Sequence, residues 1–249
     1  MKRILILGGT GEAAELAAKA SSVDGVEIIT SLAGRTRNPS TPLGELRIGG
    51  FGGKAGLAAY LRDAEIDVLI DATHPFAAQI SFNAAGAAVE CGLPHLMLIR
   101  PAWQKELGDR WLEVETIETA AAALQNQAKR VFLTIGRQEL AAFASLDDIW
   151  FLMRMIDPPE AGALLPKGLL LYNRGPFSLI EERDLLIEYG IETLVSKNSG
   201  GEATYAKILA ARELGIKVVM VKRPPIPLGE QVCDVDSAIA WLIRNLENA

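Results

Sequence analysis

The stretch ILILGGTGEAAELA, residues 4–17, decides the fold of the N-terminal half. A run of branched apolar residues ends in a glycine turn, and alanine-rich sequence follows at once. Gly9, Gly11 and Ala14 match G-x-G-x-x-G/A, in which the first glycine permits the tight turn, the second admits a pyrophosphate, and the third position lets helix and strand pack closely. Amide groups and the dipole at a helix start favour an anion. The stretch predicts a dinucleotide-binding turn, with a bare structural turn as the alternative.

The same alternation of short apolar runs and alanine-rich stretches continues along the chain and predicts βαβ units with mostly parallel sheets. Strands are expected near residues 2–7, 26–32, 45–48, 67–71, 94–99, 130–135, 148–154, 168–172, 192–196 and 217–221. Helices are expected near residues 11–20, 52–64, 76–92, 117–127, 178–189, 202–214 and 235–247. The rhythm restarts after RPAWQKELGDRW (100–111). The predicted fold class is therefore α/β with two Rossmann-like domains, residues 1–108 and 109–249.

Composition excludes several classes of protein. The 25 basic and 31 acidic residues among 249 give a net charge of -6, which argues against general binding of nucleic acid or anionic membranes. Cys91 and Cys233 lie in no CxxC or Cys/His cluster, so we expect neither a disulfide framework nor a metal site. The sequence shows no secretion signal and no apolar run of membrane-spanning length. We expect a cytoplasmic protein without a membrane anchor.

The end of the second strand indicates which dinucleotide binds. NAD sites usually place Asp or Glu there, whereas IITSLAGRT (28–36) has Thr30, Ser31 and then Arg35. Hydroxyls and a guanidinium suit an adenosine 2'-phosphate, so the pattern predicts NADP, the alternative being a solvated arginine. DATHPFAAQIS (71–81) follows the fourth strand at the ligand edge, where His74 is either a proton donor or a residue satisfied by backbone. The predicted cofactor residues are Gly9, Thr10, Gly11, Glu12, Ser31, Arg35, Thr73, His74 and Pro75.

Two glycine turns in the second half repeat the arrangement of strand, turn and helix start. They are LTIGRQEL (133–140) and SKNSGGEATYAKI (196–208), with further basic residues near strand ends. Backbone amides and converging cations suit a polyanionic ligand, while ordinary helix capping is the alternative. The predicted substrate residues are Arg137, Arg174, Lys197, Ser199, Gly200, Gly201 and Lys222.

These motifs, together with SLAGRT (31–36) and RPAW (100–103), resemble the precorrin-6A reductases, including the cobalt-precorrin-6A form, in order along both halves. The resemblance implies NADPH-dependent reduction of a macrocycle double bond in the vitamin B12 (cobalamin) pathway, giving precorrin-6B. It implies an NADP-binding first domain, a substrate-binding second domain and the macrocycle in the cleft between them. Precorrin-6A, a tetrapyrrole-derived polycarboxylate, suits a basic site, and neighbouring pathway enzymes are further candidate partners.

The proton donor stays open among His74, Lys197, Tyr205 and water. Two other functions are weighed against the reductase. One is an NADP-dependent reductase or epimerase of another small molecule, although no tyrosine has the lysine four residues on that short-chain enzymes use. The other is a non-catalytic NADP sensor, which has no need of a basic site for a polycarboxylate.

Overall fold

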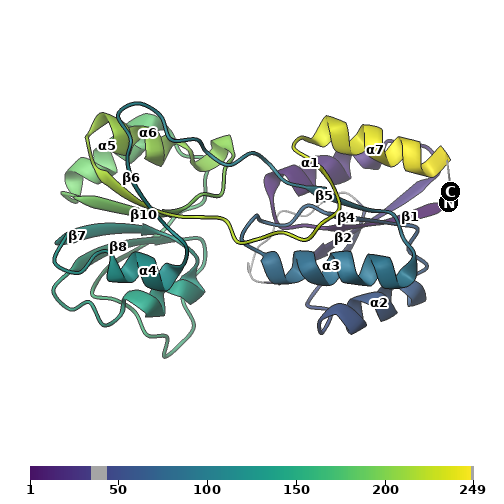
Figure 1. The fold of residues 1–249 in the computed structure, drawn as a ribbon, viewed down its shortest axis with the longest axis horizontal. Helices are drawn as coiled ribbons and strands as arrows, with labels where there is room; N and C mark the ends of the chain where they lie inside the picture. The colour runs from purple at the N-terminus through teal and green to yellow at the C-terminus, as the bar shows by residue number, and fades with distance from the viewer. Residues whose placement is uncertain (35–43, 248–249) are drawn as a thin grey trace. The chain divides into compact units, whose positions relative to one another are not determined.

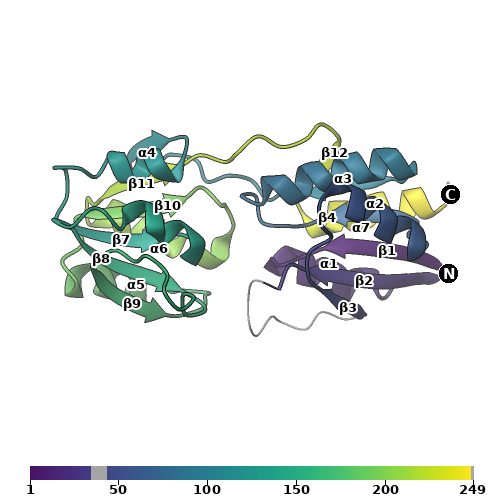
Figure 2. The same cartoon turned by 90° about the horizontal axis from the view of Figure 1, so that it is seen from below.

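A computed structural model of the chain describes residues 1–34 and 44–247, which form two compact units (Figures 1 and 2). Unit 1 comprises Met1–Pro101 and Pro224–Ala249, and unit 2 comprises Ala102–Arg223. The predicted boundary at residue 108 is therefore wrong, as is the placement of the C-terminal helix in the second domain. The physical reason is that the C-terminal segment adds a strand and a helix to unit 1.

Unit 1 is built on a six-stranded sheet in the order β12-β5-β4-β1-β2-β3. Every neighbouring pair is parallel. The strands are β1 (Lys2–Leu7), β2 (Val26–Leu32), β3 (Glu45–Ile48), β4 (Val68–Asp71), β5 (His95–Leu98) and β12 (Glu230–Val232).

Four helices cover this sheet, two on each face (Figure 1). They are α1 (Gly11–Ala20), α2 (Lys54–Asp63), α3 (Ala78–Cys91) and α7 (Val235–Glu247). Alternate residues of β1 face opposite sides, so Ile4 and Ile6 pack towards α1 and α7, whereas Leu5 and Leu7 pack towards α2 and α3. Each of these side chains is at most 2% exposed, and full burial of one contributes about 1.5–3 kcal/mol.

Unit 2 has a second parallel sheet in the order β6-β11-β10-β7-β8-β9. Its strands are β6 (Arg110–Val114), β7 (Arg130–Thr134), β8 (Trp150–Met155), β9 (Gly168–Tyr172), β10 (Thr193–Lys197) and β11 (Lys217–Val221). Its helices are α4 (Ile117–Ala122), α5 (Leu179–Glu188) and α6 (Ala206–Glu213), with the 3-10 turns η1 (Arg137–Phe143) and η2 (Glu202–Thr204). Figure 1 shows α5 and α6 together on one face and α4 on the other.

Strand order reverses at one place in each sheet. In unit 1 the chain runs outward from β1 through β2 to β3 and outward from β4 to β5, so the reversal lies between β1 and β4. In unit 2 it lies between β7 and β10. Ligands of open α/β sheets bind at the carboxyl ends of the strands beside such a reversal. Both glycine turns after β1 and β10 therefore stand at ligand-binding positions.

All ten predicted strands are present, which confirms the predicted fold class. The sequence missed two strands, β6 and β12, and both lie at the edge of a sheet. None of the helices in the described part of the chain has the length and apolar content that spanning a membrane requires.

Candidate functional site

The glycine turn of unit 1 leaves open space above the start of α1. Gly9 has a φ of +114°, a region that favours glycine. A Cβ built on Gly9 or on Gly11 would meet no atom within 4 Å, whereas a Cβ on Gly8 would lie 3.2 Å from Cγ2 of Thr30. The close packing predicted for Ala14 belongs instead to Ala13, which is 1% exposed. Gly8 and Ala13 thus join helix to sheet, and Gly9 and Gly11 keep the ligand side clear.

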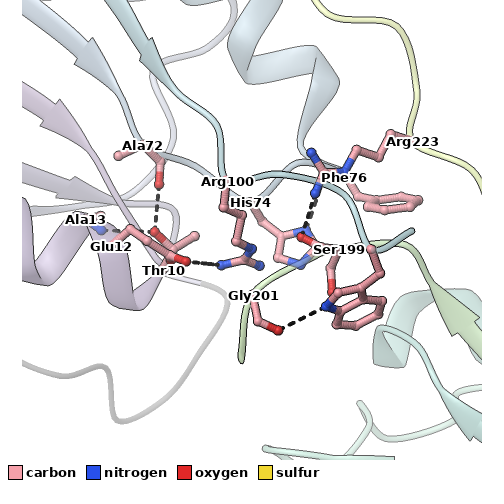
Figure 3. A network of polar contacts seen from close by, with 11 residues as sticks. Thr10, Glu12, Ala13, Ala72, His74, Phe76, Arg100, Ser199, Gly201 and Arg223 are labelled. Atoms are coloured by element: carbon pink, nitrogen blue, oxygen red, sulfur yellow. Dashed lines mark hydrogen bonds and ion pairs between the residues drawn. The ribbon is translucent and has the colours of Figure 1, made fainter. Parts of the chain in front are cut away.

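Thr10 links this turn to the end of β4. Its hydroxyl donates to the carbonyl of Ala72 at 2.9 Å and accepts from the amide of Ala13 at 3.1 Å, as Figure 3 shows. The second bond caps α1 and satisfies one of the four amides that a helix start leaves unpaired. Thr10 therefore fixes the two strand ends of the unit 1 reversal to one another.

Asp71 builds the turn after β4. This turn positions the predicted cofactor residues Thr73, His74 and Pro75. The Asp71 carboxylate is 3% exposed and accepts from the amide and the hydroxyl of Thr73, at 3.0 and 2.6 Å. Nδ1 of His74 accepts from the amide of Phe76 at 3.2 Å, so a neutral imidazole carries its proton on Nε2 (Figure 3). A small pocket is lined by Thr10, Glu12, Thr73, Pro75, Leu98 and Arg100.

Arg100 is a part of this pocket that sequence reasoning missed. Its Nη1 donates to both carboxylate oxygens of Glu12, at 3.0 and 2.8 Å (Figure 3). Glu12 lies in the first turn of α1, where a carboxylate competes with any bound anion for the same amides. The guanidinium neutralises that carboxylate. The proline-containing motif at residues 100–103 gave no signal for this pairing, because its partner lies 88 residues away.

Beside Ser31 the structure places a second missed cation, Arg47 on β3. Arg47 Nη1 lies 3.3 Å from Oγ of Ser31, and the guanidinium also donates to the carbonyls of Gly49 and Gly50. Its central carbon stands 3.8 Å from the centre of the Phe51 ring. Arg35, the residue predicted for this role, lies outside the described residues. Arg47 thus supplies a fixed positive charge at the carboxyl ends of β2 and β3.

The predicted substrate residues of unit 2 lie at or just after the carboxyl ends of its parallel strands, and they therefore share one edge of the sheet. Arg137 follows β7, Arg174 follows β9, Lys197 ends β10 and Lys222 follows β11. Lys197 forms an ion pair with Glu139, and Lys222 with Glu115 at 2.8 Å. The hydrogen bond that Lys222 donates to Glu115 raises the pKa of Lys222. Glu139 and Glu115 thus offset two of these positive charges.

The glycine turn after β10 is held by Asn198, Trp103 and Arg223. The Asn198 side chain accepts from the amide of Trp103 at 2.8 Å and donates to its carbonyl at 3.0 Å. The Trp103 indole donates to the carbonyl of Gly201 at 3.1 Å, and Arg223 donates to the carbonyls of Asn198 and Ser199, at 2.9 and 3.0 Å. Gly200 and Gly201 have φ of +68° and +80°, so only glycine fits this turn without strain.

Tyr205 takes part in a different network from the turn amides. Its hydroxyl lies 3.1 Å from Oε1 of Glu106 and accepts from Arg212 at 2.9 Å. Arg212 also forms an ion pair with Asp109 at 2.8 Å, and hydrogen bonding to Asp109 raises the pKa of Arg212. This arrangement gives the Tyr205 hydroxyl a structural role beside α6.

The chain matches a known protein family along almost its whole length. A family model described as precorrin-6x reductase CbiJ/CobK matches residues 3–243. The chain belongs to this family. The precorrin-6A reductase of Rhodococcus erythropolis is 53% identical over 243 residues, 97% of this chain and 98% of the relative. The precorrin-6A reductase of Mycobacterium tuberculosis strain H37Rv is 46% identical over the same shares.

A more distant relative and a solved structure agree with the family assignment. The cobalt-precorrin-6A reductase of Priestia megaterium is 29% identical over 97% of this chain and 98% of its own. A solved CobK precorrin-6A reductase superposes with a TM-score of 0.92 at 40% identity, covering 98% of this chain and 97% of the other. The precorrin-6x reductase family and its two parallel α/β domains were thus correctly predicted, and the chain is an oxidoreductase. The open turn at Gly9 and Gly11 fits a dinucleotide cofactor.

Proposed function

We propose that this protein uses NADPH to reduce one double bond of the precorrin-6A macrocycle, giving precorrin-6B in cobalamin biosynthesis. The observation that carries the proposal is the open glycine turn at the unit 1 strand reversal, in a chain that matches the reductase family along its length. Bound NADPH supplies the hydride. The protein binds and orients the cofactor and the substrate, and it excludes water from them.

The cofactor residues divide by the part of NADPH that they contact. The amides of Gly9, Thr10 and Gly11 hold the pyrophosphate, with Glu12 kept neutralised by Arg100. Ser31 and Arg47 bind the 2'-phosphate, and the sequence adds Arg35 to this set. Thr73, His74 and Pro75 contact the nicotinamide half, since they follow β4 at the strand reversal.

Unit 2 binds the carboxylates of the macrocycle in this proposal. Its contribution is the cations Arg137, Arg174, Lys197 and Lys222 together with the amides of Ser199, Gly200 and Gly201. Because Lys197 and Lys222 already hold Glu139 and Glu115, substrate carboxylates must displace these acids, whose side chains are then hydrated. Such an exchange favours a polyanion over a single carboxylate.

We propose the metal-free macrocycle as the substrate, because the names of the more similar relatives indicate it. Those at 53% and 46% identity carry the name precorrin-6A reductase, whereas the cobalt-precorrin-6A reductase of Priestia megaterium is 29% identical. We place the protein in the cytoplasm as a pathway enzyme, acting on this small molecule and on neither nucleic acid nor membrane. Neighbouring pathway enzymes are proposed as further partners.

An anaerobic assay with purified protein, NADPH and either metal-free or cobalt-loaded precorrin-6A tests the proposal. We expect loss of NADPH absorbance and a product heavier by two hydrogen atoms, with the metal-free macrocycle preferred. NADPH binding without oxidation in the presence of either macrocycle would identify a sensor and refute the reductase. Faster turnover of the cobalt form would refute only the substrate preference.

A further inference from the structure

A buried cluster of three charged residues lies on the face of the unit 2 sheet that α5 and α6 cover. Arg154 on β8 contacts Glu182 on α5, with 2.6 Å between Nη1 and Oε1. Lys207 belongs to the first turn of α6. The Arg154 and Glu182 side chains are 8% and 1% exposed, and Lys207 is 5% exposed. Lysine is almost never buried to this extent unless it is paired.

The cluster holds two cations and one acid. Arg154 occupies Oε1 of Glu182, and Oε2 of that carboxylate has no hydrogen-bond partner among the described residues. The Lys207 ammonium lies over the Trp103 ring, with Nζ 5.4 Å from the ring centre. Arg154 from β8 and Glu182 from α5 are the charged groups that face it.

Taken together, this environment disfavours the charged form of Lys207. Burial is the largest cause, and repulsion from Arg154 adds to it, while Glu182 opposes both; together they lower the pKa of Lys207 to about 7. The positive end of the α6 dipole acts in the same direction. An acid whose pKa lies near the working pH transfers protons most efficiently.

The position of Lys207 is as informative as its environment. It follows the Gly200–Gly201 turn, at the carboxyl edge beside the β7/β10 reversal where ligands of such sheets bind. Trp103, over which its ammonium lies, also donates to Gly201. Two other candidates for the proton donor already have partners. Lys197 is paired with Glu139, and the Tyr205 hydroxyl lies between Glu106 and Arg212.

We propose that Lys207 is the proton donor of the reduction, with Glu182 as the acidic group that faces its ammonium. The proposal rests on the proposed function. Hydride from bound NADPH adds to one carbon of the substrate double bond, and the electron pair of that bond takes a proton from the Lys207 ammonium at the other carbon. NADPH becomes NADP⁺, the substrate gains two hydrogens, and the neutral amine regains its proton from water.

Two substitutions at this position, with a control, test the role. Lys207→Met removes the proton, and Lys207→Arg keeps a positive charge that does not dissociate near neutral pH. We expect kcat to fall about 10²-fold or more in both variants, with the Kd for NADPH unchanged. The control is Lys217→Met at the amino end of β11, which should keep wild-type kcat. Wild-type kcat in Lys207→Met, or its rescue by Lys207→Arg, would overturn the proposal.

The pH dependence supplies a second measurement. An acid must hold its proton to act, so wild-type kcat should fall as pH rises through about 7. A kcat that is constant between about pH 6 and pH 8 contradicts the role.

Unfolding measurements test the environment of Lys207 without any substrate. Below its ordinary pKa of 10.5 the unfolded lysine keeps its proton, whereas the folded one loses it above about 7. The free energy of unfolding should therefore rise with pH between these values, and Lys207→Met should remove that rise. Equal pH slopes of the free energy of unfolding in wild type and variant overturn the proposal.

The activity assay separates failure of the proposed function from failure of the proton-donor role. If the wild type oxidises no NADPH with either macrocycle, the proposed function itself fails. If the wild type turns over and Lys207→Met is equally active, only the proton-donor role fails.

Discussion

Replacing Gly11 with valine should abolish cofactor binding while leaving the fold intact. The Gly11 backbone lies outside the left-handed region, and its Cβ would enter open space, so the change in the free energy of unfolding should stay within about 1 kcal/mol. The same Cβ and its two methyl groups occupy the volume that the pyrophosphate needs. Loss of two charge-assisted hydrogen bonds costs about 3–6 kcal/mol, which is about 10²–10⁴-fold in the Kd for NADPH.

Gly8→Val is the matched control, because its Cβ would press on Thr30 at 3.2 Å instead of facing the ligand. We expect this variant to lose about 1–3 kcal/mol of stability through overpacking. Fluorescence titration with NADPH and denaturant unfolding separate the two effects. Wild-type NADPH affinity in Gly11→Val would show that the turn has only a structural role, and a large stability loss in that variant would show that the space above the turn is not open.

Three further predictions follow from the ion pairs and cations described above. Glu182→Ala should lower the free energy of unfolding by about 3–5 kcal/mol, since it leaves buried Arg154 without its counter-charge; a loss below about 1 kcal/mol in a denaturant titration contradicts this. Arg47→Ala should weaken NADPH binding about tenfold or more and NADH binding little, because only NADPH carries the 2'-phosphate; equal losses for both cofactors exclude a phosphate contact. Lys197→Ala should raise the KM for precorrin-6A, by an amount that shrinks as salt is added, and leave NADPH affinity unchanged; an unaltered KM assigns the carboxylates to other cations.

Much of the fold could be predicted because it is encoded locally. Most of the ten predicted strands are short apolar runs, since strands buried on both faces need apolar residues at consecutive positions. The exception is the edge strand β3, ELRI, which has no buried residue. The two missed strands are different. In β6 only Trp111 is buried, and β12 has three residues, EQV, none of them buried. Edge strands of this kind carry polar side chains and leave no apolar run to recognise.

In the candidate site, too, the locally encoded parts could be predicted and the parts that depend on tertiary contacts could not. The turn at residues 8–11 was visible because glycines and a helix start lie together in the sequence. Arg47, Arg100 and Trp103 were missed because tertiary contacts give them their roles: Trp103 meets Asn198 95 residues away. Lys207 stands inside the motif SKNSGGEATYAKI, but nothing in its neighbourhood in the sequence indicates that Arg154 and Glu182 face it.

The discontinuity of unit 1 has a consequence for biosynthesis. β12 and α7 leave the ribosome only after the whole of unit 2, although β12 pairs with β5 and α7 packs over the face that carries Ile4 and Ile70. At about 5–20 residues per second, the nascent N-terminal sheet waits on the order of ten seconds with β5 as an open edge and one apolar face partly uncovered. Unit 2 is contiguous and can complete its own sheet in that interval. Nascent chains halted before residue 224 should therefore depend on chaperones that cover apolar surface, a dependence that ends when α7 is released.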